Sequence, residues 1–153
     1  MGPVTLYDEL VAVLEALDGA RVEYALMGGL AVAVWGAPRA TKDINLLVRR
    51  EDVTRALAAV RSLGFTLGGL PFEFKDGTEV RRISKVDPSG DVMTLDFMVV
   101  DASLEAVWTS RTSLPLADRQ VVVVTRDALI SMKARAARPQ DLIDIRNLED
   151  IDR

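Results

Sequence analysis

The chain has 153 residues and a net charge of −4, with 49% hydrophobic and 27% charged residues, a composition typical of a folded globular domain. This acidic balance argues against a general, charge-driven nucleic-acid binder. The absence of cysteine and histidine excludes a disulfide scaffold, a Cys/His zinc site and Ser-His or Cys-His catalysis. A bound metal would have oxygen ligands only, which favours Mg²⁺ or Mn²⁺.

The hydrophobic pattern gives the expected elements in chain order. The first half is predicted to hold a helix over residues 4–18, a strand over 22–27, a turn at Gly28-Gly29, a buried helix over 30–35, a strand over 43–48 and a helix over 51–63. The second half is predicted to hold a strand opening at 65–67, a hairpin of strands 79–86 and 91–100, a helix over 104–110, a strand over 120–124, a helix over 127–137 and a last helix from Pro139.

Strands and helices are interleaved irregularly along the whole chain. This order predicts an α+β (or α/β) fold, a mixed sheet with helices packed on it, as one domain over residues 1–153. In the last helix we expect Leu142, Ile145 and Leu148 to point inward and Asp141 to cap the first turn.

The predicted location is the cytoplasm, without contact to a membrane. The N-terminus lacks the basic-then-apolar pattern of a signal peptide. The longest uncharged stretch, residues 24–38, is shorter than the roughly 20 residues that a membrane-spanning helix needs.

Gly28-Gly29 lies between a predicted strand and a predicted helix. Glycines at such a point allow a tight turn and a close approach of the backbone to a phosphate, which the first N–H groups of the helix would face. Gly-Gly pairs are also common in ordinary turns, so this feature alone leaves both interpretations open.

Asp43 and Asn45 are two residues apart on a predicted strand, and therefore lie on the same face, about 7 Å apart at ~3.3 Å per residue. Two oxygen-bearing side chains so placed could share a divalent cation. A strand end with one solvated face would explain the same pattern.

Asp96 lies in the middle of the apolar segment 93–100. Burying a carboxylate costs free energy unless it is paired or bound to a metal, which favours a functional role here. Asp96 could bind a metal and also accept the proton of an attacking hydroxyl.

The order of these features resembles the signature of the DNA polymerase β-like nucleotidyltransferase superfamily. Residues 26–29, Leu-Met-Gly-Gly, are followed after thirteen residues by 43–46, Asp-Ile-Asn-Leu, and Asp96 stands where the third carboxylate of that superfamily would be. The run 39–43 looks like the approach to the site in the AbiEii-type toxin branch. The tail from Lys133 to residue 145 also resembles that branch, while the chain length and the closing Asp-Ile-Arg-Asn-Leu are similar to small lincosamide-type antibiotic nucleotidyltransferases.

The resemblance implies a reaction and a set of roles. Two Mg²⁺ (or Mn²⁺) ions on Asp43, Asn45 and Asp96 would bind the triphosphate of an NTP, and an acceptor hydroxyl would attack the α-phosphorus and release pyrophosphate. The residues expected to bind the nucleotide or its phosphates are Gly28, Gly29, Arg39, Thr41, Lys42, Lys133 and Arg138. Arg39 and Lys42 could equally be surface charges, Thr41 a turn cap, and Arg138 a structural residue. The basic segment with Arg81, Arg82 and Lys85 is expected to be a solvated face.

Asn45 departs from the superfamily pattern, because an amide oxygen can bind Mg²⁺ but carries no charge. The leading hypothesis is an AbiEii-type, toxin-like nucleotidyltransferase that acts on a hydroxyl of RNA, protein or a small molecule and has a cognate antitoxin as partner. A first alternative is a catalytically impaired relative that binds nucleotide or a partner protein. A second alternative is an antibiotic-modifying nucleotidyltransferase. Base preference and oligomeric state stay open.

Overall fold

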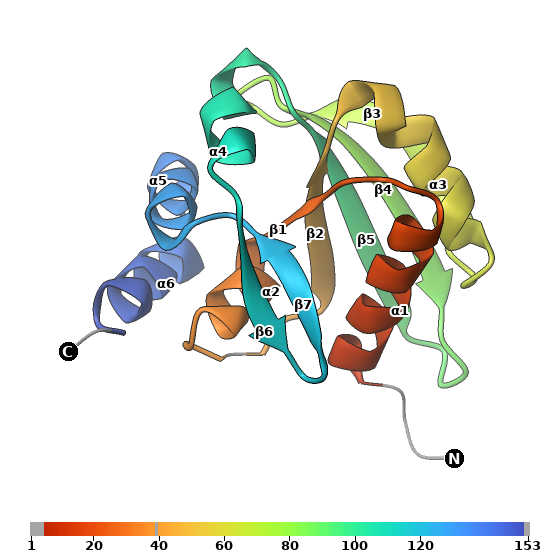
Figure 1. Cartoon of the computed structure of the whole chain (residues 1–153), viewed down its shortest axis with the longest axis horizontal. Coiled ribbons are helices and arrows are strands. Elements are labelled where there is room, and N and C mark those ends of the chain that lie inside the picture. Colours follow the sequence, from red (N-terminus) through yellow and green to blue (C-terminus); the bar gives the residue numbers. More distant parts are fainter. Residues whose placement is uncertain (1–4, 39, 152–153) are drawn as a thin grey trace.

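The computed structural model describes residues 5–38 and 40–151, which form a seven-stranded mixed sheet with helices packed on it (Figure 1). The expected α+β class is therefore confirmed. The strand order across the sheet is β3-β4-β5-β2-β1-β7-β6. No helix among the described residues has the length and apolar character needed to cross a membrane.

The strands are short, as is usual for a twisted sheet. They are β1 (Ala25–Met27), β2 (Asp43–Val48), β3 (Leu67–Glu73), β4 (Glu79–Val86), β5 (Val92–Val99), β6 (Thr112–Leu116) and β7 (Arg119–Val123). The α-helices are α1 (Leu6–Gly19), α2 (Gly28–Val34), α3 (Val53–Arg61), α4 (Glu105–Thr109), α5 (Arg126–Ala136) and α6 (Pro139–Glu149). Two 3₁₀ turns, η1 (Arg50–Asp52) and η2 (Ala102–Leu104), precede α3 and α4.

The centre of the sheet is β2, which runs parallel to β5 on one side and antiparallel to β1 on the other. β1 in turn pairs in parallel with β7, while β3–β4, β4–β5 and β6–β7 are antiparallel. The alternating residues Ile44, Leu46 and Val48 of β2 are completely buried, so hydrophobic packing fixes which face of this strand points into the core. The residues between them are left to form the other face.

One face of the sheet is packed by α1 and α3. A capping box between Thr5 and Asp8 starts α1, and the helix buries three leucines and Val13 at helical spacing. Lys85 of β4 ties the sheet to this helix, because its Nζ donates to Glu9 Oε2 at 2.6 Å and to the carbonyl of Leu63 at 3.0 Å. Lys85 is thus part of the packing between sheet and helix and not a solvated cation as the sequence pattern suggested.

Three further helices, α2, α5 and α6, lie together, with α5 in contact with both of the others (Figure 1). Pro139 occupies the first turn of α6, and the Asp141 carboxylate accepts from the backbone N–H of Arg138 at 3.0 Å, which confirms the expected cap. Leu148 is buried as predicted, but Leu142 is 57% exposed, so the expectation that it points inward is wrong. The inward positions next to the cap are taken by Asp141 and Asp144 instead.

Two strands depart from the sequence-based expectation. β3 does not stop before Gly68-Gly69 but continues through both glycines to Glu73, with positive φ at each glycine and a register shift between Gly68 and Pro71. β6 was not predicted, because it is an exposed edge strand with polar residues and Pro115. Edge strands carry little hydrophobic alternation, so periodicity does not find them.

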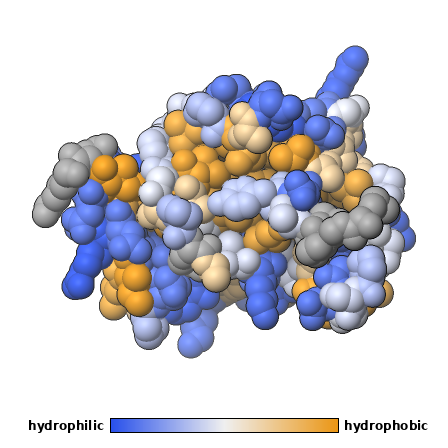
Figure 2. All heavy atoms as spheres, turned by 90° about the horizontal axis from the view of Figure 1, so that it is seen from below, coloured by the Kyte–Doolittle hydropathy of each residue, from blue (hydrophilic) through white to orange (hydrophobic). Residues whose placement is uncertain are grey.

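The surface also carries apolar side chains that the core does not use. Figure 2 shows hydrophobic residues as a band across one face, bordered by hydrophilic ones. Several of the most exposed apolar residues belong to β3 and the turn after it: Leu67, Leu70, Phe72 and Phe74. The β3 edge of the sheet is therefore an apolar rim.

Candidate active site

The polar residues of β2 and β5 lie side by side on one face of the sheet. In the parallel β2–β5 ladder, Asn45 is the register partner of Asp96 and Asp43 is the partner of Thr94. Register partners on neighbouring strands point to the same side, with their side chains a few ångströms apart. The three residues singled out from the sequence, Asp43, Asn45 and Asp96, thus share one face.

Gly28 completes this cluster at the junction of β1 and α2. Its φ is +71°, a conformation that L-residues with a side chain rarely adopt. A Cβ at this position would lie 2.3 Å from Nδ2 of Asn45, too close for any non-bonded pair. Glycine is needed here for two reasons: the positive φ of the turn and the close approach of the Asn45 amide. An ordinary turn would explain only the positive φ.

Asp96 is 4% exposed and is held by Arg82, its register partner on β4. The guanidinium donates from Nε to Oδ1 at 2.8 Å and from Nη2 to Oδ2 at 3.0 Å, a two-pronged charge-assisted pair. These hydrogen bonds raise the pKa of Arg82 above its usual value, and the charges of Asp96 and Asp43 add to this effect. The guanidinium also lies over the ring of Phe72, 5.3 Å from its centroid.

Arg82 is the candidate site residue that the sequence interpretation missed, since the basic segment was expected to be a solvated face. A usable signal existed in the predicted hairpin. Counting outward from its turn pairs Val86 with Val92 and therefore Arg82 with Asp96, as the structure has them. A basic residue opposite a buried carboxylate in a hairpin is better interpreted as its partner than as a surface charge.

The loop before β2 holds the other expected phosphate contacts. Thr41 is half-buried and Lys42 is exposed, and both immediately precede Asp43. Arg39, also expected to touch phosphate, lies outside the described residues. The placement of Thr41 and Lys42 is compatible with the roles expected of them.

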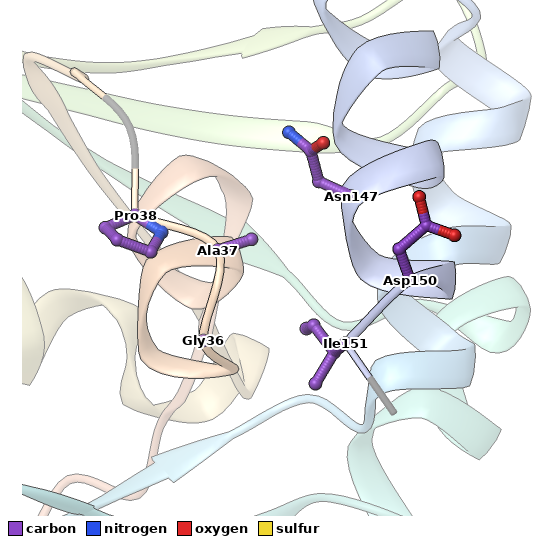
Figure 3. Close-up of a pocket in the computed structure, with 6 residues that line it drawn as sticks. All are labelled: Gly36, Ala37, Pro38, Asn147, Asp150 and Ile151. Carbon is purple, nitrogen blue, oxygen red and sulfur yellow. The ribbon is translucent and has the colours of Figure 1, made fainter. Parts of the chain in front are cut away.

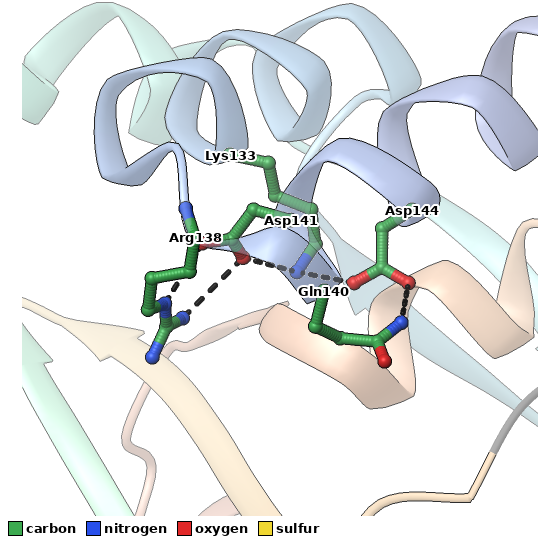
Figure 4. Close-up of polar contacts among 5 residues, drawn as sticks. All are labelled: Lys133, Arg138, Gln140, Asp141 and Asp144. Carbon is green, nitrogen blue, oxygen red and sulfur yellow. Dashed lines mark hydrogen bonds and ion pairs between the residues drawn. The ribbon is translucent and has the colours of Figure 1, made fainter.

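Lys133 and Arg138 come together where α5 meets α6, around two buried aspartates (Figure 4). Lys133 is 7% exposed, and its Nζ lies 2.9 Å from Asp144 and 3.4 Å from Asp141. Arg138 donates from Nε to Asp141 at 2.8 Å, while Gln140 donates to Asp144 at 3.0 Å. The two cations are therefore held in position by carboxylates of α6.

The Asp141 carboxyl experiences opposing effects in this cluster. Burial raises its pKa, but the hydrogen bonds from the side chain and backbone of Arg138 and the charges of Arg138 and Lys133 outweigh burial, so that the pKa lies below its usual value. Asp141 is thus an anion at neutral pH. Its charge in turn raises the pKa of Arg138 through their side-chain hydrogen bonds.

A separate shallow hollow of about 330 Å³ lies between the end of α2 and the end of α6 (Figure 3). It is lined by Gly36, Ala37, Pro38, Asn147, Asp150 and Ile151. The hollow contains none of the residues expected to bind nucleotide, so it is not part of the candidate site.

The comparison with known families decides the wider assignment. The family described as aminoglycoside-2''-adenylyltransferase matches residues 9–113 of the chain. The chain belongs to the aminoglycoside-2''-adenylyltransferase family. The matched residues include Gly28, Asp43, Asn45 and Asp96, and also Arg82. Among curated protein sequences, none matches the chain.

Solved structures agree with this family in fold. The lincomycin-bound lincosamide antibiotic adenylyltransferase LnuA matches with a TM-score of 0.68 and 16% identity, over 98% of this chain and 99% of LnuA. ANT(2")-Ia in complex with adenylyl-2"-tobramycin matches with a TM-score of 0.63 and 19% identity, over 93% of this chain and 86% of that one. An antigenic nucleotidyltransferase-like protein from Paracoccidioides brasiliensis matches with a TM-score of 0.58 and 20% identity, over 98% and 78%.

Nucleotidyltransferases of the adenylyltransferase kind generally use a divalent metal, so the donor set has to be tested against one. Among residues 5–38 and 40–151, no group of three or more acidic, His or Cys side chains is arranged to hold a metal ion. Asp43 and Asn45 offer a carboxylate and an amide oxygen on one face, which fits one ion completed by phosphates or water. Asp96 has both oxygens on Arg82, so the residues do not fit a second ion.

Proposed function

We propose that the chain transfers a nucleoside monophosphate, as AMP from ATP, to a hydroxyl group of a small antibiotic-type molecule. The observation that carries this proposal is the family match over residues 9–113, which contains all of the Gly28, Asp43, Asn45 and Asp96 cluster. The names of the similar structures support it, since they describe a lincosamide adenylyltransferase and an adenylylated tobramycin. We further propose that residues 1–153 act as one domain.

In this proposal each residue of the cluster has a distinct task. Asp43 and Asn45 would hold one Mg²⁺ or Mn²⁺, which supplies positive charge to the phosphates when bound. Gly28 and Gly29 would let the backbone approach the phosphates closely. Asp96 would accept the proton of the acceptor hydroxyl while the new oxygen–phosphorus bond forms at the α-phosphate and the bond to pyrophosphate breaks.

The basic residues would differ in how they reach the phosphates. Arg138 has a 76% exposed side chain although it is anchored on Asp141, so it can touch a phosphate directly. Lys133 is buried and would have to exchange one of its two aspartates for a phosphate oxygen. Arg39, Thr41 and Lys42 would contact the triphosphate from the loop before β2.

The direct test is adenylyl transfer to defined acceptors. The purified chain is incubated with labelled ATP, Mg²⁺ and a panel of lincosamides and aminoglycosides, and products are detected by mass. We expect transfer to at least one acceptor, its loss in Asp96→Ala, and its retention in the matched control Asp91→Ala, which changes an exposed aspartate in the β4–β5 turn. Transfer that survives in Asp96→Ala would contradict the assigned site.

The leading hypothesis from the sequence was an AbiEii-type toxin, with RNA or protein as acceptor and an antitoxin as partner, and the small-molecule alternative now replaces it. Neither the family match nor the similar structures favour the toxin hypothesis. Expression in cells separates the two candidates: the proposed function predicts growth protection against an antibiotic of the panel, whereas a toxin would arrest growth. A catalytically impaired chain would bind ATP and do neither.

A further inference from the structure

The candidate site contains a cation of its own. Asp43 and Asp96 carry one negative charge each and Asn45 carries none, while Arg82 brings one positive charge to both Asp96 oxygens. The formal charge of this group of four is therefore −1. A triphosphate is itself strongly anionic, so a site for it has to collect positive charge from metals and basic side chains.

Arg82 is fixed in place by its surroundings. Asp96, its partner, is 94% buried at the side chain and lies directly opposite on β5. Phe72 of β3 contributes its ring face to the same guanidinium. A planar fork held by two hydrogen bonds and a ring loses little freedom when it receives a further anion.

The guanidinium still has capacity for a ligand. Its side chain is 49% exposed. Nε and Nη2 are used by Asp96, and within the described part of the chain Nη1 has no hydrogen-bond partner. Arg82 therefore presents a free N–H edge on the face that carries Asp43 and Asn45. The negative charge of Asp43 also contributes to the raised pKa of Arg82.

We infer that the guanidinium of Arg82 takes the place of a second metal ion in this site, so that the chain binds one divalent cation with its nucleotide, on Asp43 and Asn45, instead of two. This inference rests on the proposed nucleotide-binding function. Arg82 neutralises Asp96 permanently, because its pKa is far above any physiological pH. Its free Nη1 would donate to a phosphate oxygen of the bound nucleotide.

The neutral Asn45 agrees with this arrangement. A second metal ion on Asp96 would need the Asp96 oxygens and further anionic ligands, because two divalent ions close together repel each other strongly. Asn45 supplies no charge, and Arg82 occupies Asp96. The neutral Asn45 and the cationic Arg82 both reduce the negative charge that is available to bind a second ion. They lie with Asp96 in one row across β2, β5 and β4.

The experiment counts Mn²⁺ ions bound to the full chain with the non-transferable analogue α,β-methylene ATP. Electron paramagnetic resonance measures the bound ions per bound analogue and shows spin coupling when two Mn²⁺ ions lie about 4 Å apart. For the wild type we expect one ion per analogue and no coupling. Arg82→Leu is expected to bind a second, spin-coupled ion, since it frees both oxygens of Asp96.

Three further variants make the result specific to Arg82. Arg82→Lys keeps a positive charge and should keep a single ion. Arg81→Leu removes a charge from the same strand but on its opposite face, and should also keep a single ion. Arg82→Gln keeps a hydrogen-bond donor without the charge, and takes the place of Arg82→Leu if thermal denaturation shows that the leucine variant does not fold.

The three possible negative results contradict different claims. Two coupled Mn²⁺ ions in the wild type would overturn the inference and leave the proposed function intact. A single ion in both Arg82→Leu and Arg82→Gln would overturn the role of Arg82. Failure of the wild type to bind the analogue at all, measured by calorimetry, would overturn the proposed function and the inference with it.

Discussion

Asn45 lies opposite Asp96 on the neighbouring parallel strand, and its amide group fills the space that a side chain on Gly28 would occupy. The Asn45 side chain of β2 thus lies between β5 and the turn that connects β1 to α2. The position of Asn45 is sensitive to both neighbours, since a shift in the turn or in the β2–β5 register would separate it from one of them.

Gly28→Ala is expected to destabilise the protein by about 2 kcal/mol or more and to weaken nucleotide binding. The positive φ alone costs roughly 1–2 kcal/mol for a residue with a side chain, and the new methyl group would collide with Asn45. Urea unfolding and calorimetric titration with α,β-methylene ATP measure the two effects. Gly19→Ala at the end of α1 is the matched control, since nothing lies within 4 Å of its Cβ position, and it should be neutral or slightly stabilising. Equal behaviour of the two variants would show that the close contact at Gly28 is not important.

Asn45→Asp is expected to bind Mg²⁺ or Mn²⁺ about tenfold more tightly, or ~1.4 kcal/mol, since it adds a negative charge beside Asp43 without changing the shape of the side chain. Calorimetric metal titration in the presence of the ATP analogue measures this change. Asn147→Asp adds the same charge on the exposed face of α6 and should leave metal affinity unchanged. No difference between the two variants would argue against metal binding at position 45.

Lys133→Met is expected to lower the free energy of unfolding by about 3–5 kcal/mol, because it leaves Asp141 and Asp144 buried without their shared cation. Lys75→Met removes an exposed lysine from the β3–β4 turn and should change stability by no more than about 0.5 kcal/mol. Urea denaturation of both variants provides the comparison. If Lys133→Met unfolds at the same urea concentration as the control, then the cluster does not hold α5 against α6.

The depressed pKa of Asp141 predicts how stability depends on pH. A carboxyl whose pKa is lower in the folded state stabilises fully above its unfolded value, here 3.8, and loses that contribution as the pH falls through the folded value. Asp141→Asn should therefore be less stable than the wild type at pH 7, and the difference in Tm should shrink as the pH drops below about 3.8. Asp118→Asn, in the exposed β6–β7 turn, is the matched control and should match the Tm of the wild type at pH 7. A constant difference across this range would contradict the role of Asp141.

Much of the fold follows from local patterns in the sequence. The β4–β5 hairpin was predicted almost to the residue, because a turn of Asp, Pro, Ser and Gly separates two alternating segments. The buried alternation of β2 likewise predicted that Asp43 and Asn45 share a face. The edge strands β3 and β6 were cut short or missed, because their pairing satisfies backbone groups without burying an alternating set of side chains.

The site was only partly accessible to the same reasoning. Asp96 could be selected from the sequence, because it is an isolated carboxylate in the apolar segment of β5. Identifying its partner Arg82 required the pairing of β4 with β5. Lys133 was predicted to face a triphosphate, whereas the two buried aspartates that hold it come from the next helix and enter through the packing of α5 on α6. The ion-pair partners of Asp96 and Lys133 are determined by tertiary contacts, and the periodicity of a single strand or helix does not predict these contacts.

The parallel pairing of β2 with β5 also has a consequence for folding. The two strands are separated in the chain by η1, α3, β3 and β4, so their pairing closes a long loop, and we expect it to form after the β3–β4–β5 meander. On this expectation Asp43 and Asp96 would meet only at that late step, and partly folded chains would lack the proposed nucleotide site. A nucleotide that binds the completed site would stabilise the last contacts to form, and would slow unfolding more than it speeds folding.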